Sequence, residues 1–99
     1  MQLARFLNNI FKNDGFLLID ADLKKYIIGS PKKKIPVTLK ILNKKLHYKL
    51  LLRPDLYFGE AYSDGDIIIE NGTLTDFLDL ALMNIGRGEI NFFSKLINK

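Results

Sequence analysis

Residues 59–72, GEAYSDGDIIIENG, contain four carboxylates, of which Glu60, Asp64 and Asp66 lie close together. Carboxylates at this spacing can form a general acid and base pair or bind a metal ion. A calcium loop of the EF-hand type needs oxygen ligands at alternating positions, but isoleucines fill residues 67–69. No pocket motif accompanies the acids. We therefore expect turn-forming and capping roles for them, with acid–base chemistry as the alternative.

His47 is the single histidine, and the chain has no cysteine. A histidine without a second ligand at suitable spacing, or a nucleophile motif, is a poor candidate for metal binding or catalysis. We interpret His47 as a surface or packing residue. The motifs GxGxxG, GxxxxGK[ST], HExxH and GxSxG are absent from the sequence. We therefore expect no catalytic, cofactor-binding or metal-ligating residue in these 99 residues.

Positive charge is concentrated in the first half of the chain. Residues 1–53 contain twelve lysines and arginines against three acids, whereas residues 54–99 contain three against eight. Such a distribution favours phosphate groups, in lipid headgroups or in nucleic acid. Arginine is scarce, which makes nucleic acid the less favoured partner; a solvated lysine-rich surface is the other alternative. The candidate headgroup-binding residues are Lys32, Lys33, Lys34, Lys44, Lys45 and Lys49.

The length of the chain predicts a single small domain, residues 1–99, and no apolar run reaches the roughly 20 residues of a membrane-spanning helix. The first residues lack the apolar region and cleavage site of a secretory signal. We expect a cytoplasmic location, peripheral to the inner face of the membrane. The sequence leaves the oligomeric state open.

Hydrophobic periodicity predicts one helix and three strands in the first part of the chain. The helix spans residues 3–11, and its apolar stripe faces either the core or a membrane surface. Residues 15–20 and 23–29 read as a hairpin around Asp20-Ala21-Asp22. Residues 35–42 alternate as a half-buried strand after a lysine-rich loop.

Helices predominate in the second part of the chain. We expect a helix that is capped by Asn43 and ends before Pro54, and a second helix that begins with Pro54. Asp64-Gly65 and Asn71-Gly72 are predicted turns on either side of a strand over residues 66–70. A last helix over residues 74–85 would begin at a capping box. The box pairs Thr73 with Asp76. These elements predict an α+β fold with a mostly antiparallel sheet of about four strands.

A group of short motifs connects these elements to a known family. They are PDL at 54–56, GEAY at 59–62, DG at 64–65, IE at 69–70, Gly72 and DFLDL at 76–80. Together they resemble the amino-terminal domain of cyclopropane-fatty-acyl-phospholipid synthases, and the preceding helix and strands follow in the family's order. Ser63 departs from the family, which usually has methionine there. The resemblance gives structural roles to Gly59, Glu60, Tyr62, Asp64 and Gly65.

The resemblance implies a parent enzyme that transfers a methylene group from S-adenosylmethionine to an acyl chain of membrane phospholipid. The cofactor and the catalytic groups would belong to a carboxyl-terminal methyltransferase domain, and no residue here matches them. The implied fold is similar to sterol-carrier-type lipid-binding domains, and the implied role is association with phospholipid and packing against the methyltransferase domain. The alternative is an independent basic domain that binds lipid or nucleic acid.

Residues 88–99, GEINFFSKLINK, form a further amphipathic segment. Ile90, Phe93 and Ile97 fall on one helical face after a break at Gly86-Arg87-Gly88. This face would contact the methyltransferase domain or membrane lipid, in which case residues 88–99 link the two domains. Alternatively, it completes the core of this domain.

Overall fold

The computed structural model describes residues 1–84, which fold into four helices and four strands. Their order, helix, three strands, two helices, strand and helix, is the predicted one. The bounds are α1 (Gln2–Ile10), β1 (Gly15–Ile19), β2 (Lys25–Gly29), β3 (Thr38–Ile41), α2 (Lys45–Leu52), α3 (Pro54–Asp64), β4 (Ile67–Glu70) and α4 (Leu74–Asn84). The amphipathic segment at 88–99 lies outside the described residues.

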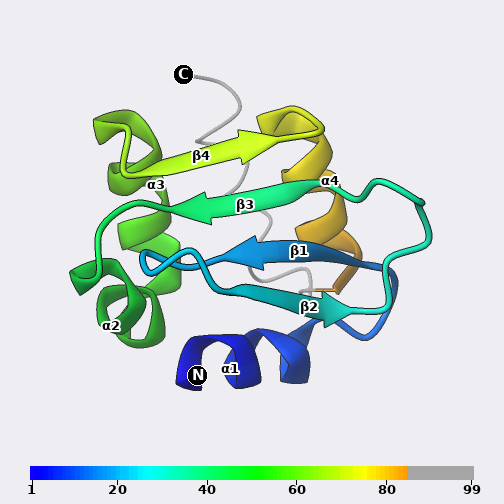
Figure 1. Ribbon diagram of the computed structural model, residues 1–99, viewed down its shortest axis with the longest axis horizontal. Coiled ribbons are helices and arrows are strands. Elements are labelled where there is room, and N and C mark those ends of the chain that lie inside the picture. Colours follow the sequence, from blue (N-terminus) through cyan, green and yellow to red (C-terminus); the bar gives the residue numbers. More distant parts are fainter. Residues whose placement is uncertain (85–99) are drawn as a thin grey trace.

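The four strands form one mixed sheet in the order β2-β1-β3-β4 (Figure 1). β1 pairs antiparallel with β2 and β3 pairs antiparallel with β4, while β1 and β3 run parallel. The parallel pair arises because residues 30–37 cross the start of β1 before β3 begins. Asp14 holds this crossing, since its Oδ1 accepts the N–H of Lys32 at 2.9 Å. The α+β fold with a mostly antiparallel sheet is confirmed.

The helices lie on one face of the sheet, and α3 and α4 are behind it in the view of Figure 1. Three phenylalanine rings join the two layers. The Phe16 ring of β1 lies edge-on to Phe11, after α1, at 5.0 Å and to Phe77 of α4 at 5.1 Å between ring centroids. Buried aliphatic side chains of all four strands surround them: Leu18, Ile28, Leu39, Ile41 and Ile67.

The apolar stripe of α1 belongs to this core. Leu3 and Ala4 are buried, and Phe6, Leu7 and Ile10 pack against the buried cluster. Of the two expectations for this stripe, the core is therefore correct. None of the described helices combines the length and apolar character needed to cross a membrane.

The turn at Gly65 and the capping box at the start of α4 have the predicted chemistry. Gly65 ends α3 with φ of 81°, a left-handed conformation that glycine adopts without steric cost. α4 begins with the predicted capping box: the Thr73 N–H donates to Asp76 Oδ2 at 2.9 Å, and the Asp76 N–H donates to Thr73 Oγ1 at 3.1 Å. In the second turn, Asn71 rather than Gly72 takes the positive φ.

Candidate functional site

The acidic segment of residues 59–72 is built into the scaffold. Glu60 and Asp64 are exposed on α3, and Asp66 is half-buried before β4. The Asp66 N–H donates to the carbonyl oxygen of Ala61 at 2.8 Å, which ties the turn to the helix. Within residues 1–84, no group of three or more carboxylate or imidazole side chains is placed to hold a metal ion. Gly59 and Tyr62 also lie in α3.

The six candidate lysines form two groups at opposite ends of β3, not one patch. Lys32, Lys33 and Lys34 precede β3 in the crossing loop, whereas Lys44, Lys45 and Lys49 follow it at the beginning of α2 and in its second turn. Figure 1 shows the crossing loop and α2 at opposite ends of the strands. The sequence could have shown this separation, because the predicted strand over residues 35–42 lies between the two groups.

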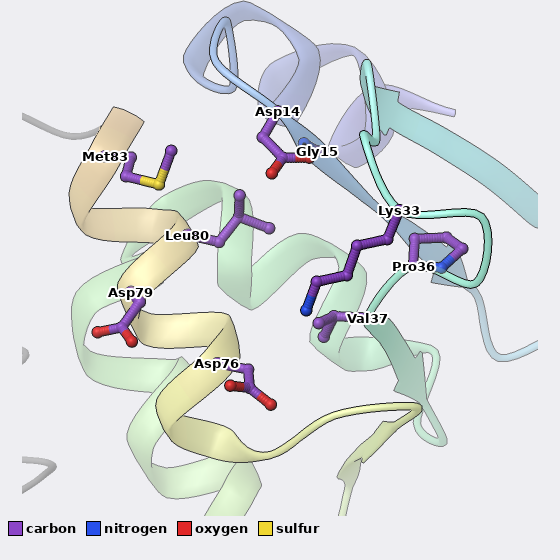
Figure 2. Close-up of a pocket in the computed structure, with 9 residues that line it drawn as sticks. All are labelled: Asp14, Gly15, Lys33, Pro36, Val37, Asp76, Asp79, Leu80 and Met83. Carbon is purple, nitrogen blue, oxygen red and sulfur yellow. Dashed lines mark hydrogen bonds between the residues drawn. The ribbon is translucent and has the colours of Figure 1, made fainter.

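Carboxylates lie beside Lys33 of the first lysine group. A cavity of about 210 Å³ next to the loop is lined by Lys33 together with Asp14, Asp76 and Asp79. Lys33 extends toward the two carboxylates of α4 (Figure 2). The hydrogen bond from the Lys32 N–H and the charges of Lys32 and Lys33 lower the pKa of Asp14. Asp14, Asp76 and Asp79 therefore lie beside Lys33, which lines the same cavity.

The second lysine group lies on an exposed face of α2. Lys45, Tyr48, Lys49 and Leu52 are spaced as one helical stripe, which we call the α2 stripe. The side of α2 that carries Leu46 and Leu50 is buried in the core. Because no acid occurs between residues 43 and 53, the charge of the α2 stripe is not offset along the helix.

Two large side chains of the α2 stripe lie in solvent. Tyr48 is 67% exposed and Leu52 is 76% exposed. The Lys49 ammonium lies 5.4 Å from the ring centre of Tyr57 on α3, within the range of a cation–π contact. The α2 stripe therefore presents two lysines, a tyrosine and a leucine on one exposed face of the helix.

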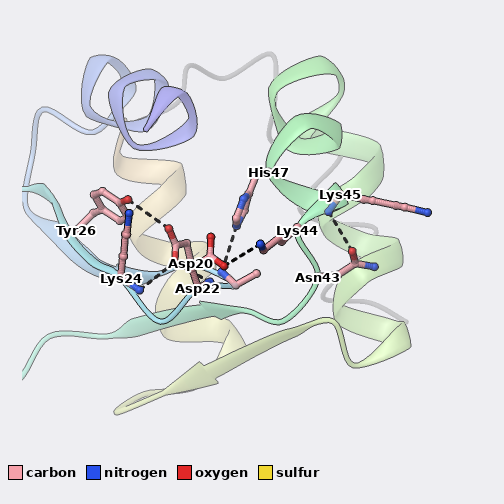
Figure 3. A network of polar contacts seen from close by, with 9 residues as sticks. Asp20, Asp22, Lys24, Tyr26, Asn43, Lys44, Lys45 and His47 are labelled. Atoms are coloured by element: carbon pink, nitrogen blue, oxygen red, sulfur yellow. Dashed lines mark hydrogen bonds and ion pairs between the residues drawn. The ribbon is translucent and has the colours of Figure 1, made fainter.

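A polar network fixes the start of α2 against the β1–β2 turn, residues 20–24 (Figure 3). His47 Nε2 accepts the N–H of Ala21 at 3.3 Å, and Lys44 Nζ lies 3.0 Å from Asp22 Oδ1. Lys45 points away from the network in Figure 3. His47 is half-buried and therefore has a packing role, one of the two roles expected from the sequence.

Asp20 organises the turn itself. Its buried side chain accepts the N–H groups of Asp22 and Lys24 through Oδ1, each at 2.9 Å, and the Tyr26 hydroxyl donates to Oδ2 at 3.2 Å. The sequence predicted a hairpin here but not the buried carboxylate. An aspartate at the first position of a short connection could have indicated it, because its side chain can accept a hydrogen bond from the backbone N–H two residues later.

Comparison with known proteins gives no match, either to a protein-family model or to a curated protein. The candidate site therefore rests on the geometry of the α2 stripe and of the turn beside it.

Proposed function

We propose that this chain is a non-catalytic module that associates with anionic phospholipid, as the amino-terminal domain of an enzyme of the cyclopropane synthase type. The α2 stripe is the observation that carries the proposal. Its lysines match the negative charge of phospholipid headgroups, and its tyrosine and leucine match the apolar boundary below them.

The expected binding energy is that of a weak peripheral contact. A lysine near an anionic membrane surface contributes about 1 kcal/mol. Burying the exposed part of a leucine side chain such as Leu52 contributes about 1–2 kcal/mol. Binding free energies of this size fit a domain that lengthens the time its parent enzyme spends on lipid without anchoring it permanently.

The resemblance in the sequence suggests separate roles for this domain and for the methyltransferase domain. A reaction on acyl chains of membrane phospholipid needs the enzyme at the bilayer surface. In this proposal residues 1–84 supply that contact, while S-adenosylmethionine and the reacting groups belong to a methyltransferase domain after residue 99. Packing against that domain is the second part of the proposed role, with Ile90, Phe93 and Ile97 as its candidate contacts.

Charge reversal on the α2 stripe tests this proposal. The double variant Lys45→Glu/Lys49→Glu should bind vesicles with anionic lipid at least about tenfold more weakly than the unaltered chain, because attraction at two positions becomes repulsion. Vesicle co-sedimentation at low salt measures the change.

The matched control is Lys32→Glu/Lys34→Glu, which changes the net charge by the same amount in the crossing loop. Its binding should change by less than about threefold if the α2 stripe faces the membrane. Equal losses in the two variants would show that only net charge matters and would count against the α2 stripe. Preferential binding of the unaltered chain to single-stranded nucleic acid would favour the alternative function.

A further inference from the structure

Leu23, in the turn beside α2, has a backbone conformation and a solvent exposure that are unusual for leucine. Leu23 has φ of 69°, in the left-handed region that glycine and asparagine occupy readily and leucine rarely does. Its side chain is also 69% exposed. Leucine here therefore costs backbone strain and gains little burial in the domain.

Several hydrogen bonds restrain the backbone of this turn on both sides of Leu23. The Leu23 N–H donates to the Asp20 carbonyl oxygen at 2.9 Å, and the Asp20 N–H donates to the Lys24 carbonyl oxygen at 2.9 Å. The Asp20 carboxylate also binds the backbone on both sides of Leu23, at Asp22 and Lys24. The left-handed conformation is thus fixed by its surroundings, a pattern that is typical of functional positions.

Leu23 lies in a turn that contacts the start of α2, and Asp22, which precedes it, is paired with Lys44. Lys24 and Lys25 follow Leu23 directly. The contacts from Ala21 to His47 and from Asp22 to Lys44 hold the turn against the first turn of α2. Leu23 is thus an exposed apolar tip that two lysines follow, in a turn joined to the helix that carries the α2 stripe.

We propose that Leu23 is an apolar anchor that inserts below the headgroups of an anionic membrane when the α2 stripe binds it. This inference rests on the proposed function and adds a second contact element. Lipid is the partner that fits, because a single projecting side chain can enter fluid hydrocarbon without a shaped pocket. Lys24 and Lys25, which follow Leu23, complement anionic headgroups.

The test uses tryptophan as a local probe, since the chain has none of its own. In the full chain, Leu23→Trp should show a blue-shifted emission when anionic vesicles are added, and brominated acyl chains should quench it. The matched control is Ile35→Trp, at a position that is 68% exposed in the crossing loop. Its emission should stay unchanged, since that loop is at the other end of β3.

A second variant separates insertion from folding. Leu23→Asn keeps a residue that tolerates the left-handed conformation, so the melting temperature should be unchanged or higher. Its vesicle affinity should fall about fivefold to tenfold, because the inserted leucine is lost.

The outcomes distinguish the two proposals. If vesicle binding depends on Lys45 and Lys49 but Leu23→Trp is not shifted and Leu23→Asn binds normally, the anchor is wrong and the proposed function stands. If the unaltered chain does not bind anionic vesicles, both proposals are wrong.

Discussion

Replacing Phe16 by alanine should destabilise the domain by about 4 kcal/mol, the largest effect expected of a single core substitution here. Phe16 is fully buried and its ring lies edge-on to Phe11 and Phe77, so the change removes apolar area and two aromatic contacts at once. Urea denaturation followed by circular dichroism measures the loss of unfolding free energy.

Leu17→Ala is the matched control, because Leu17 is the next residue of β1 and points to the opposite face of the sheet. That face carries no described helix, and Leu17 is only half-buried. We expect a loss of about 1 kcal/mol. Equal losses at Phe16 and Leu17 would contradict the one-sided core.

Asp20→Ala should cost about 3 kcal/mol, because it leaves the turn without the acceptor of two backbone N–H groups and of the Tyr26 hydroxyl. Thermal unfolding measures this loss. Asp22→Ala is the control: Asp22 is exposed and makes a surface ion pair with Lys44, so its loss should lie within about 0.5 kcal/mol. A stable Asp20→Ala variant would show that the turn does not depend on the buried carboxylate.

The same carboxylate predicts a pH dependence of stability. Burial raises the pKa of Asp20, but the hydrogen bonds from the Lys24 and Asp22 N–H groups and the Tyr26 hydroxyl outweigh it, so the pKa lies below its ordinary value of 3.8. A lowered folded-state pKa adds stability that is complete above the unfolded pKa and is lost as the pH falls through the folded one. Asp20→Asn should therefore flatten the loss of stability below about pH 4.

Local signals in the sequence predicted the elements well. The stripe of residues 3–11, the Pro54 helix start, Gly65 and the Thr73–Asp76 capping box each depend on neighbours within a few positions, and each is present in the structure. The element bounds differ from the predicted ones mainly at strand ends. β3, for example, is limited to Thr38–Ile41 within the predicted 35–42.

Long-range features could not be read from the sequence. The parallel pairing of β1 with β3 depends on which way residues 30–37 cross the sheet, and local patterns do not determine that path. The contact of His47 with Ala21 joins two segments that are far apart in the sequence, and hydrophobic periodicity gives no information on such pairs. Periodicity likewise did not indicate that the Asp20 carboxylate is buried. The left-handed Leu23 is likewise invisible, since leucine gives no signal for positive φ.

Binding of the unaltered chain to vesicles of defined charge tests the central claim most directly. We expect binding to vesicles that contain anionic phospholipid and little binding to neutral vesicles. Binding should also be lost as salt rises from about 0.01 M to 0.5 M, because salt shortens the Debye length. Equal binding to anionic and neutral vesicles, or binding that salt does not change, would contradict it.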